Sequence, residues 1–216
     1  MPRQNPCCKM PHMIELPHSP AADRNKQPIL DALSRVLGAR GNALEIASGT
    51  GQHVAAFASA LREWVWQPTD VDASMLPALA SRIEDAGLPN LRPPLLLDVT
   101  EPQWPSHGAA LTKSFDAIYC ANMLHIAPPA ACAGLMRGAA RHLLSGGMLI
   151  TYGPYFDESP SAPSNRAFDE SLRARNPLWG IRRLNDVAAE AQRHGLVLRE
   201  RHEMPANNLL LVFVLA

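Results

Sequence analysis

The chain has 216 residues, and its 20 Lys and Arg balance its 20 Asp and Glu, so the formal net charge is zero. This balance argues against a protein that binds nucleic acid through broad electrostatics, which would carry a basic excess. Hydrophobic residues make up 47% of the chain, which is typical of a folded domain and not of a disordered one. The longest apolar run is too short for a membrane helix, and no apolar signal segment opens the chain. We therefore expect a soluble, cytoplasmic protein that does not bind membranes.

Strand and helix patterns alternate after a Pro-rich start. Ser19 and Pro20 are typical of a helix N-terminus, and apolar residues at helical spacing continue to Leu37. The segments that follow are a strand over 43–47, a glycine turn over 48–51 leading into a helix, a strand over 64–70, a helix over 74–85, strands over 95–98 and 115–120, a helix over 130–144, a strand over 148–152, an irregular polar stretch to 180, a helix over 185–193, and strands over 196–201 and 209–215.

This alternation predicts an α/β fold with a mostly parallel, doubly wound sheet and helices on both of its faces. The last two strands are joined by too few residues for a crossover helix, so we expect them to form a C-terminal antiparallel hairpin. We expect residues 1–17 to be a disordered leader and residues 18–216 to be a single domain.

The cysteines do not suggest a metal site. Cys7 and Cys8 are adjacent in the leader, whereas Cys120 and Cys132 fall in apolar stretches. Because neither a Cys-x-x-Cys pair nor a His/Cys quartet occurs, we expect no metal site and no disulfide framework.

Acidic residues and glycines gather where the first three strands end. The first strand carries Glu45 and turns through Gly49 and Gly51, where a ligand can approach the main chain closely. Asp70 closes the second strand, where a carboxylate can accept hydrogen bonds from a ribose diol, and Asp98 closes the third, where it can accept from an adenine amine. Taken alone, Asp70 is about as compatible with a helix cap. Together, the four features indicate a nucleoside with a cationic amino-acid tail.

The ligand that fits this pattern best is S-adenosylmethionine. The third glycine of a dinucleotide-binding Gly-x-Gly-x-x-Gly motif would fall at Val54, which disfavours a seat for a pyrophosphate and so disfavours NAD. S-adenosylmethionine is cationic and has no phosphate, and it suits an acid-rich pocket.

A family resemblance is carried by eight short segments. They are 21–26 (AADRNK), 44–53 (LEIASGTGQH), 66–72 (WQPTDVD), 97–100 (LDVT), 122–125 (NMLH), 150–155 (ITYGPY), 175–180 (RNPLWG) and 204–208 (MPANN). With these segments, residues 18–216 resemble class I S-adenosylmethionine-dependent methyltransferases and, more narrowly, the methyltransferase-like 26 family, long known as a domain of unknown function. The resemblance implies a seven-stranded methyltransferase sheet with an antiparallel last strand.

The resemblance also implies roles in cofactor binding. Gly49 and Gly51 would form the loop, Asp70 would bind the ribose, Asp98 with Val99 the adenine, and Asn122 with Met123 would lie near the methionine portion. The other residues that we expect around the cofactor are Arg24, Asn25, Glu45, Ala47 and Val71.

Candidate residues for catalysis and substrate binding follow the fourth and fifth strands. His125 is the best candidate for a general base, with Tyr152 beside it, although a lone His at this place is more often an orienting or packing group. The candidate substrate residues are Tyr155, Arg173, Asn176, Trp179 and Asn207. An internal ion-pair cluster around Asp169 explains the arginines equally well, and hairpin-turn chemistry explains Asn207. We expect a methyltransferase with a small-molecule acceptor; the alternative is a non-catalytic scaffold or sensor that binds S-adenosylmethionine or S-adenosylhomocysteine.

Overall fold

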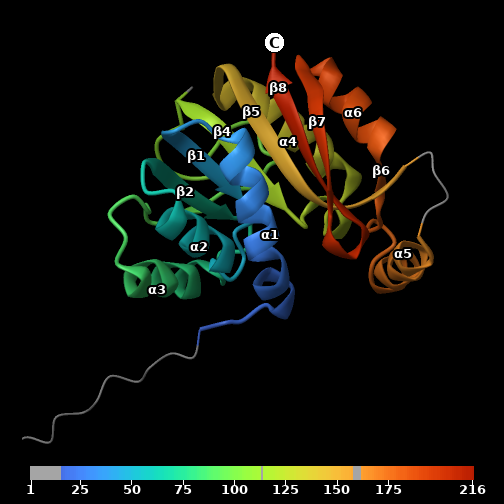
Figure 1. The fold of residues 1–216 in the computed structure, drawn as a ribbon, viewed down its shortest axis with the longest axis horizontal. Helices are drawn as coiled ribbons and strands as arrows, with labels where there is room; N and C mark the ends of the chain where they lie inside the picture. Colours follow the sequence, from blue (N-terminus) through green and yellow to red (C-terminus); the bar gives the residue numbers. More distant parts are fainter. Residues whose placement is uncertain (1–15, 113, 158–161) are drawn as a thin grey trace, which may run out of the picture.

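The computed structural model describes residues 16–112, 114–157 and 162–216. The leader up to residue 15, with Cys7 and Cys8, lies outside these ranges. A twisted sheet runs through the centre of the molecule, with helices packed on its two faces (Figure 1).

The sheet has the strand order β3-β2-β1-β4-β5-β8-β7, and the short β6 pairs with the end of β5. Strands β1 to β5 are parallel, whereas β8 runs antiparallel to both β5 and β7. This confirms the α/β fold class, the mostly parallel sheet and the C-terminal antiparallel strands. The strand bounds are β1 Gly41–Ile46, β2 Trp64–Asp70, β3 Leu95–Leu96, β4 Phe115–Ala121, β5 Leu143–Phe156, β6 Arg182–Arg183, β7 Leu196–Met204 and β8 Asn208–Leu215.

Six α-helices and two short 3₁₀ helices, η1 and η2, are found in the described ranges. The first α-helix begins as the sequence predicts, since the Ser19 side chain accepts a hydrogen bond from the Ala22 amide (3.3 Å) and Pro20 occupies the first turn. The helix bounds are α1 Pro20–Val36, α2 Gln52–Ala60, α3 Leu76–Ala86, η1 Leu124–Ile126, α4 Pro129–His142, α5 Pro163–Arg175, α6 Leu184–Arg193 and η2 Pro205–Asn207.

The sheet separates two hydrophobic cores. On one face, α1, α2 and α3 contribute Ile29, Phe57 and Leu79. On the other face, α4 and α6 contribute Leu135 and Val187. Alternate residues of a strand point to opposite faces, so each central strand supplies side chains to both cores.

Three predicted elements differ from the structure. The stretch expected to be irregular contains α5, which begins at Pro163, because proline is tolerated in the first turn of a helix. The helix expected over 130–144 ends at His142, and β5 begins at Leu143 and continues to Phe156. Strand β3 comprises only Leu95–Leu96, so that Asp98 follows the strand instead of closing it.

Within the described ranges, no helix combines the length and apolar character needed to cross a bilayer. The same ranges hold no group of three or more His, Cys, Asp or Glu side chains arranged to bind a metal ion.

Candidate functional site

The site lies at the carboxyl ends of β1 and β4. Strand β1 lies between β2 and β4 in the sheet, so the chain winds away from β1 in both directions, and ligands of α/β sheets bind at such a switch point. The residues directly after the two strands, Ala47 (φ 57°) and Asn122 (φ 58°), both have left-handed backbone angles. Positive φ is uncommon for residues other than glycine, and such strain is concentrated at functional sites.

The glycine loop after β1 is held by Asp70. Its Oδ2 accepts a hydrogen bond from the Gly49 amide (2.7 Å), and its Oδ1 accepts one from the Asp72 amide (3.0 Å). Gly49 and Gly51 both have positive φ, and a Cβ on Gly51 would lie 2.5 Å from Leu79 Cδ1. The Asp70 carboxylate thus supports the loop and keeps further lone pairs for a ligand.

Glu45 lies in β1 with its carboxyl group almost completely buried, at 2% exposure. Burial raises its pKa to about 8, and the neighbouring Asp70 carboxylate adds to this shift, whereas a hydrogen bond with Ser48 opposes it. The Oε2 atom has no hydrogen-bond partner among the described residues. Tyr119 is paired with Glu45 in the register of β1 and β4, and its buried hydroxyl likewise has no partner there.

Asn25 links α1 to this cluster. His53 Nε2 donates to Asn25 Oδ1 (2.6 Å), and the Asn25 side chain also forms a hydrogen bond with the Tyr152 hydroxyl. Burial, with a smaller contribution from Lys26, lowers the pKa of His53 to about 4, so the imidazole is neutral. Asn25, Glu45, His53 and Tyr152 therefore meet on the sheet face covered by α1 and α2, whereas Arg24 is exposed on α1.

Gln52, at the start of α2, fastens the first turn of α1 over the glycine loop. Its Oε1 accepts hydrogen bonds from the Ser19 amide (2.6 Å) and the Thr50 hydroxyl (2.9 Å), and its Nε2 donates to Asp23 Oδ1 (2.9 Å). Arg82 of α3 also donates to the carbonyl oxygen of Pro17 (2.7 Å).

Three further residues flank the ends of β2 and β3. Val71, directly after Asp70, is an exposed hydrophobic residue at 59%. Asp98 Oδ1 accepts hydrogen bonds from the amide (2.8 Å) and hydroxyl (2.7 Å) of Thr100. Val99 is buried in the core under α4. Val71 and Asp98 can face a ligand, whereas the Val99 side chain packs inward.

His125 lies on η1, close to the middle of β5. A Cβ on Gly153 would lie 3.4 Å from His125 Nδ1, and the imidazole makes an edge contact with Phe168 of α5 at 5.5 Å between ring centroids. Burial, together with Arg182 and Arg175, lowers the pKa of His125 to about 4. No hydrogen bond to this imidazole is found in the described part of the chain. Met123, which precedes η1, is partly buried against the α4 core.

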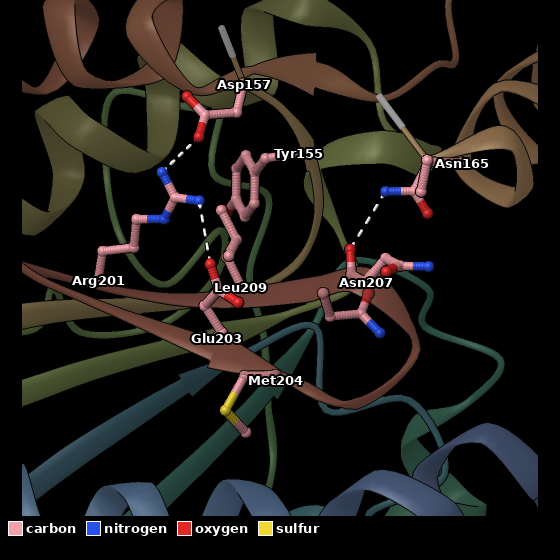
Figure 2. A pocket seen from close by; sticks show the side chains of 10 residues that line it. Tyr155, Asp157, Asn165, Arg201, Glu203, Met204, Asn207 and Leu209 are labelled. Carbon is pink, nitrogen blue, oxygen red and sulfur yellow. Dashed lines mark hydrogen bonds and ion pairs between the residues drawn. The ribbon is translucent and has the colours of Figure 1, made fainter. Parts of the chain in front are cut away.

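The candidate substrate residues fall in two places. Tyr155 and Asn207 line a cavity of about 270 Å³ (Figure 2). Arg173 is ion-paired with Asp169 (2.8 Å), the Asn176 side chain accepts from the Leu178 amide (3.0 Å), and Trp179 packs under the Arg175 guanidinium. The ion-pair explanation therefore holds for Arg173.

The sequence interpretation missed three residues of these sites. Tyr119 has the pattern of a core aromatic residue in a strand, and only its unpartnered hydroxyl marks it. Asp157 and Arg201 form an ion pair at the cavity, across 44 residues of sequence, and no local motif announces such a contact.

Solved structures with a similar fold are methyltransferases about twice as long. An O-methyltransferase family protein from Burkholderia thailandensis matches with a TM-score of 0.72 and 18% identity, over 90% of this chain and 57% of that one. The mitomycin 7-O-methyltransferase MmcR matches with a TM-score of 0.74 and 17% identity, over 91% and 54%. The pyocyanin biosynthetic protein PhzM matches with a TM-score of 0.69 and 17% identity, over 91% and 59%. The chain thus spans little more than half of each of these proteins, and at such identities the likeness shows the fold.

The family of the chain follows from the sequence match along nearly its whole length. Residues 16–214 match the family DUF938, described as a protein of unknown function, and the chain belongs to this family, with the fold of class I methyltransferases.

Proposed function

We propose that the chain is an S-adenosylmethionine-dependent methyltransferase with a small-molecule acceptor. The observation that carries the proposal is the buried Glu45 carboxyl, whose Oε2 has no partner among the described residues. A buried polar group without a hydrogen bond is costly, and an ammonium group from a ligand would satisfy it. The unpartnered Tyr119 hydroxyl beside it calls for a ligand at the same place.

The other residues of the site suit the remaining parts of this cofactor. Asp70, at the end of β2, would bind the ribose hydroxyls. Val71 offers an exposed apolar surface to the adenine, and Asp98 offers an acceptor for its amine. The DUF938 membership, the methyltransferase fold and the resemblance to the methyltransferase-like 26 family support the same assignment.

When bound, S-adenosylmethionine supplies an electrophilic methyl group on a cationic sulfur. The residues of the chain would mainly bind and orient the two reactants, which accounts for much of the rate in such displacements. The His125 imidazole is neutral and can take up a proton, but its low pKa makes it a weak base. The Tyr152 hydroxyl is bound to Asn25, and burial raises its pKa. We therefore assign both residues to the positioning of the acceptor.

This weak basicity also favours the second candidate function, a scaffold or sensor that binds S-adenosylmethionine or S-adenosylhomocysteine without turnover. The cofactor residues would be the same in both. Conversion of S-adenosylmethionine to S-adenosylhomocysteine in the presence of an acceptor distinguishes an enzyme from a binding protein.

Calorimetric titration of wild type and Glu45→Gln tests the proposal. We expect S-adenosylmethionine and S-adenosylhomocysteine to bind the wild type and NAD not to bind. Glu45→Gln should weaken S-adenosylhomocysteine at least about tenfold, because the ammonium loses its buried counter-charge. Methylthioadenosine, which lacks the amino-acid portion, should bind both proteins equally.

Glu63→Gln, at an exposed position before β2, serves as the control and should bind like the wild type. A preference for NAD, or no binding of S-adenosylhomocysteine to the wild type, would refute the proposal. An equal loss of both adenosine ligands in Glu45→Gln would refute the contact between Glu45 and the amino-acid portion.

A further inference from the structure

A second polar site lies at the far end of β5. The cavity of about 270 Å³ is bounded by the end of β5, the start of α5 and the turn between β7 and β8 (Figure 2). Tyr155, Met204 and Leu209 give it an apolar floor. The Tyr155 hydroxyl is turned away, since it donates to Thr151 Oγ1 (2.8 Å), and so the ring is the part of this side chain available to a ligand.

Three asparagines form one wall of the cavity, and all three use their NH₂ groups within the protein. Asn165 Nδ2 donates to the Asn207 carbonyl oxygen (3.1 Å), Asn207 Nδ2 donates to Ser164 Oγ (3.0 Å), and Asn208 Nδ2 donates to the Pro205 carbonyl oxygen (2.9 Å). Their Oδ1 atoms accept no hydrogen bond from any described residue. This wall, defined by Asn165, Asn207 and Asn208, therefore offers acceptors to a ligand and has its donors engaged.

The opposite wall is ionic. Arg201 forms an ion pair with Asp157 and lies 3.5 Å from Glu203 Oε1, as Figure 2 shows. Two carboxylates thus surround one guanidinium, which leaves the wall with a formal charge of minus one. The Arg201 donors are directed at these carboxylates, so an anionic ligand would have to displace one of them.

We propose that this cavity binds a small amine, whose ammonium group donates to the asparagine oxygens and the carboxylates while its apolar body packs on Tyr155. Both walls present acceptors and negative charge, which select a cationic donor and disfavour carboxylates and phosphates. The volume is just below the roughly 300–1,000 Å³ of pockets for drug-sized ligands, so the ligand is of metabolite size.

The cavity borders the region where methyl transfer would occur. Asn208 and Leu209 pair in register with Pro154 and Gly153 of β5, and Gly153 lies against His125. Resting on the proposed function, we assign the amine-bearing ligand as the methyl acceptor.

Three phenyl compounds that differ in one group test the selectivity. Phenethylamine, 2-phenylethanol and 3-phenylpropionate share an aromatic body and end in an ammonium, a hydroxyl and a carboxylate. We expect phenethylamine to bind the wild type with an affinity at least about tenfold higher than 3-phenylpropionate by calorimetric titration. Equal or tighter binding of the carboxylate, or no binding of the amine at millimolar concentration, would overturn the proposal.

Two substitutions in the cavity should shift amine binding in opposite directions. Glu203→Gln removes a largely exposed carboxylate, with 84% side-chain exposure, and should weaken phenethylamine about two- to fivefold. Asn207→Asp adds a carboxylate where φ is 55°, an angle that Asp tolerates, and should strengthen it. Glu200→Gln, on the same strand but paired with His202, is the matched control. Unchanged amine affinity in both cavity variants would overturn the proposal.

Titration of the same variants with S-adenosylhomocysteine separates the two proposals. We expect its affinity to be the same in all of them. If the wild type binds S-adenosylhomocysteine but not phenethylamine, the amine site fails and the methyltransferase proposal stands. If it binds phenethylamine but not S-adenosylhomocysteine, the methyltransferase proposal fails together with the assignment of the amine as acceptor.

Discussion

Glu45 makes the stability of the fold depend on pH. Its pKa is about 8 in the folded protein against an ordinary value of 4.5. Between these values the folded state keeps the proton and the unfolded state has lost it. The stabilisation is therefore fully present below pH 4.5 and is lost as the pH rises through 8. Relative to Glu45→Gln, the wild type should lose up to about 1.4 kcal/mol of unfolding free energy per pH unit in this window.

Urea unfolding of both proteins at pH 5, 6, 7 and 8 measures this difference. His53 and His125 have lowered pKa values, so their stabilisation has the opposite sign: it is present above pH 6.5 and is lost as the pH falls towards 4. Both histidines are retained in Glu45→Gln and their contributions cancel in the comparison. Parallel stability curves for the two proteins would show that Glu45 ionises normally in the folded state.

Single residues of the site were predictable from sequence where the signal is local. Glu45, Gly49, Gly51 and Asp70 each lie at a strand end or in a turn, and the structure places them together because parallel strands end at one edge of the sheet. Tyr119 was not predictable, because a tyrosine in an apolar strand differs from a core residue only through the partners of its hydroxyl.

Between elements, Gln52 carries the contact that keeps the start of α1 on α2. Gln52→Leu removes its hydrogen bonds to Ser19, Thr50 and Asp23. We expect amide hydrogen exchange over residues 19–26 to accelerate about tenfold and exchange in α4 to stay the same, because only the local opening energy falls. Gln27→Leu, which removes a hydrogen bond within α1 to Asp31, is the control. Unchanged protection of residues 19–26 would mean that apolar packing alone holds this turn.

The elements show where sequence patterns suffice and where they do not. Helices α1, α2 and α4 have an apolar stripe and clear boundaries, so their existence is evident from spacing. Helix α5 has only Asn165 and Leu172 buried, and a Pro-rich context hides its start. The length of β5 depends on its pairing with β8 and β6, which is a tertiary contact and leaves no local pattern. The cavity beside β5 has the same origin, since α5 and β7 meet there only in the folded chain.

For the molecule as a whole, the two cores make stability separable from cofactor binding. Gly138 of α4 packs against the Trp104 indole, which is stacked on His142 at 5.1 Å between ring centroids. Alanine in a helix is ordinarily favoured over glycine by about 1 kcal/mol. Here a Cβ would overlap the Trp104 ring, so Gly138→Ala should instead destabilise the fold by about 1–3 kcal/mol in urea unfolding.

Gly38→Ala is the matched control, because a Cβ at Gly38 meets no atom within 4 Å, and its stability should stay within about 0.5 kcal/mol of the wild type. The affinity for S-adenosylhomocysteine should be unchanged in both variants, since Glu45 and Asn25 lie on the face covered by α1 and α2, across the sheet from α4. A loss of cofactor affinity in Gly138→Ala, with the fold retained, would show that the α4 core and the cofactor site are coupled through the sheet.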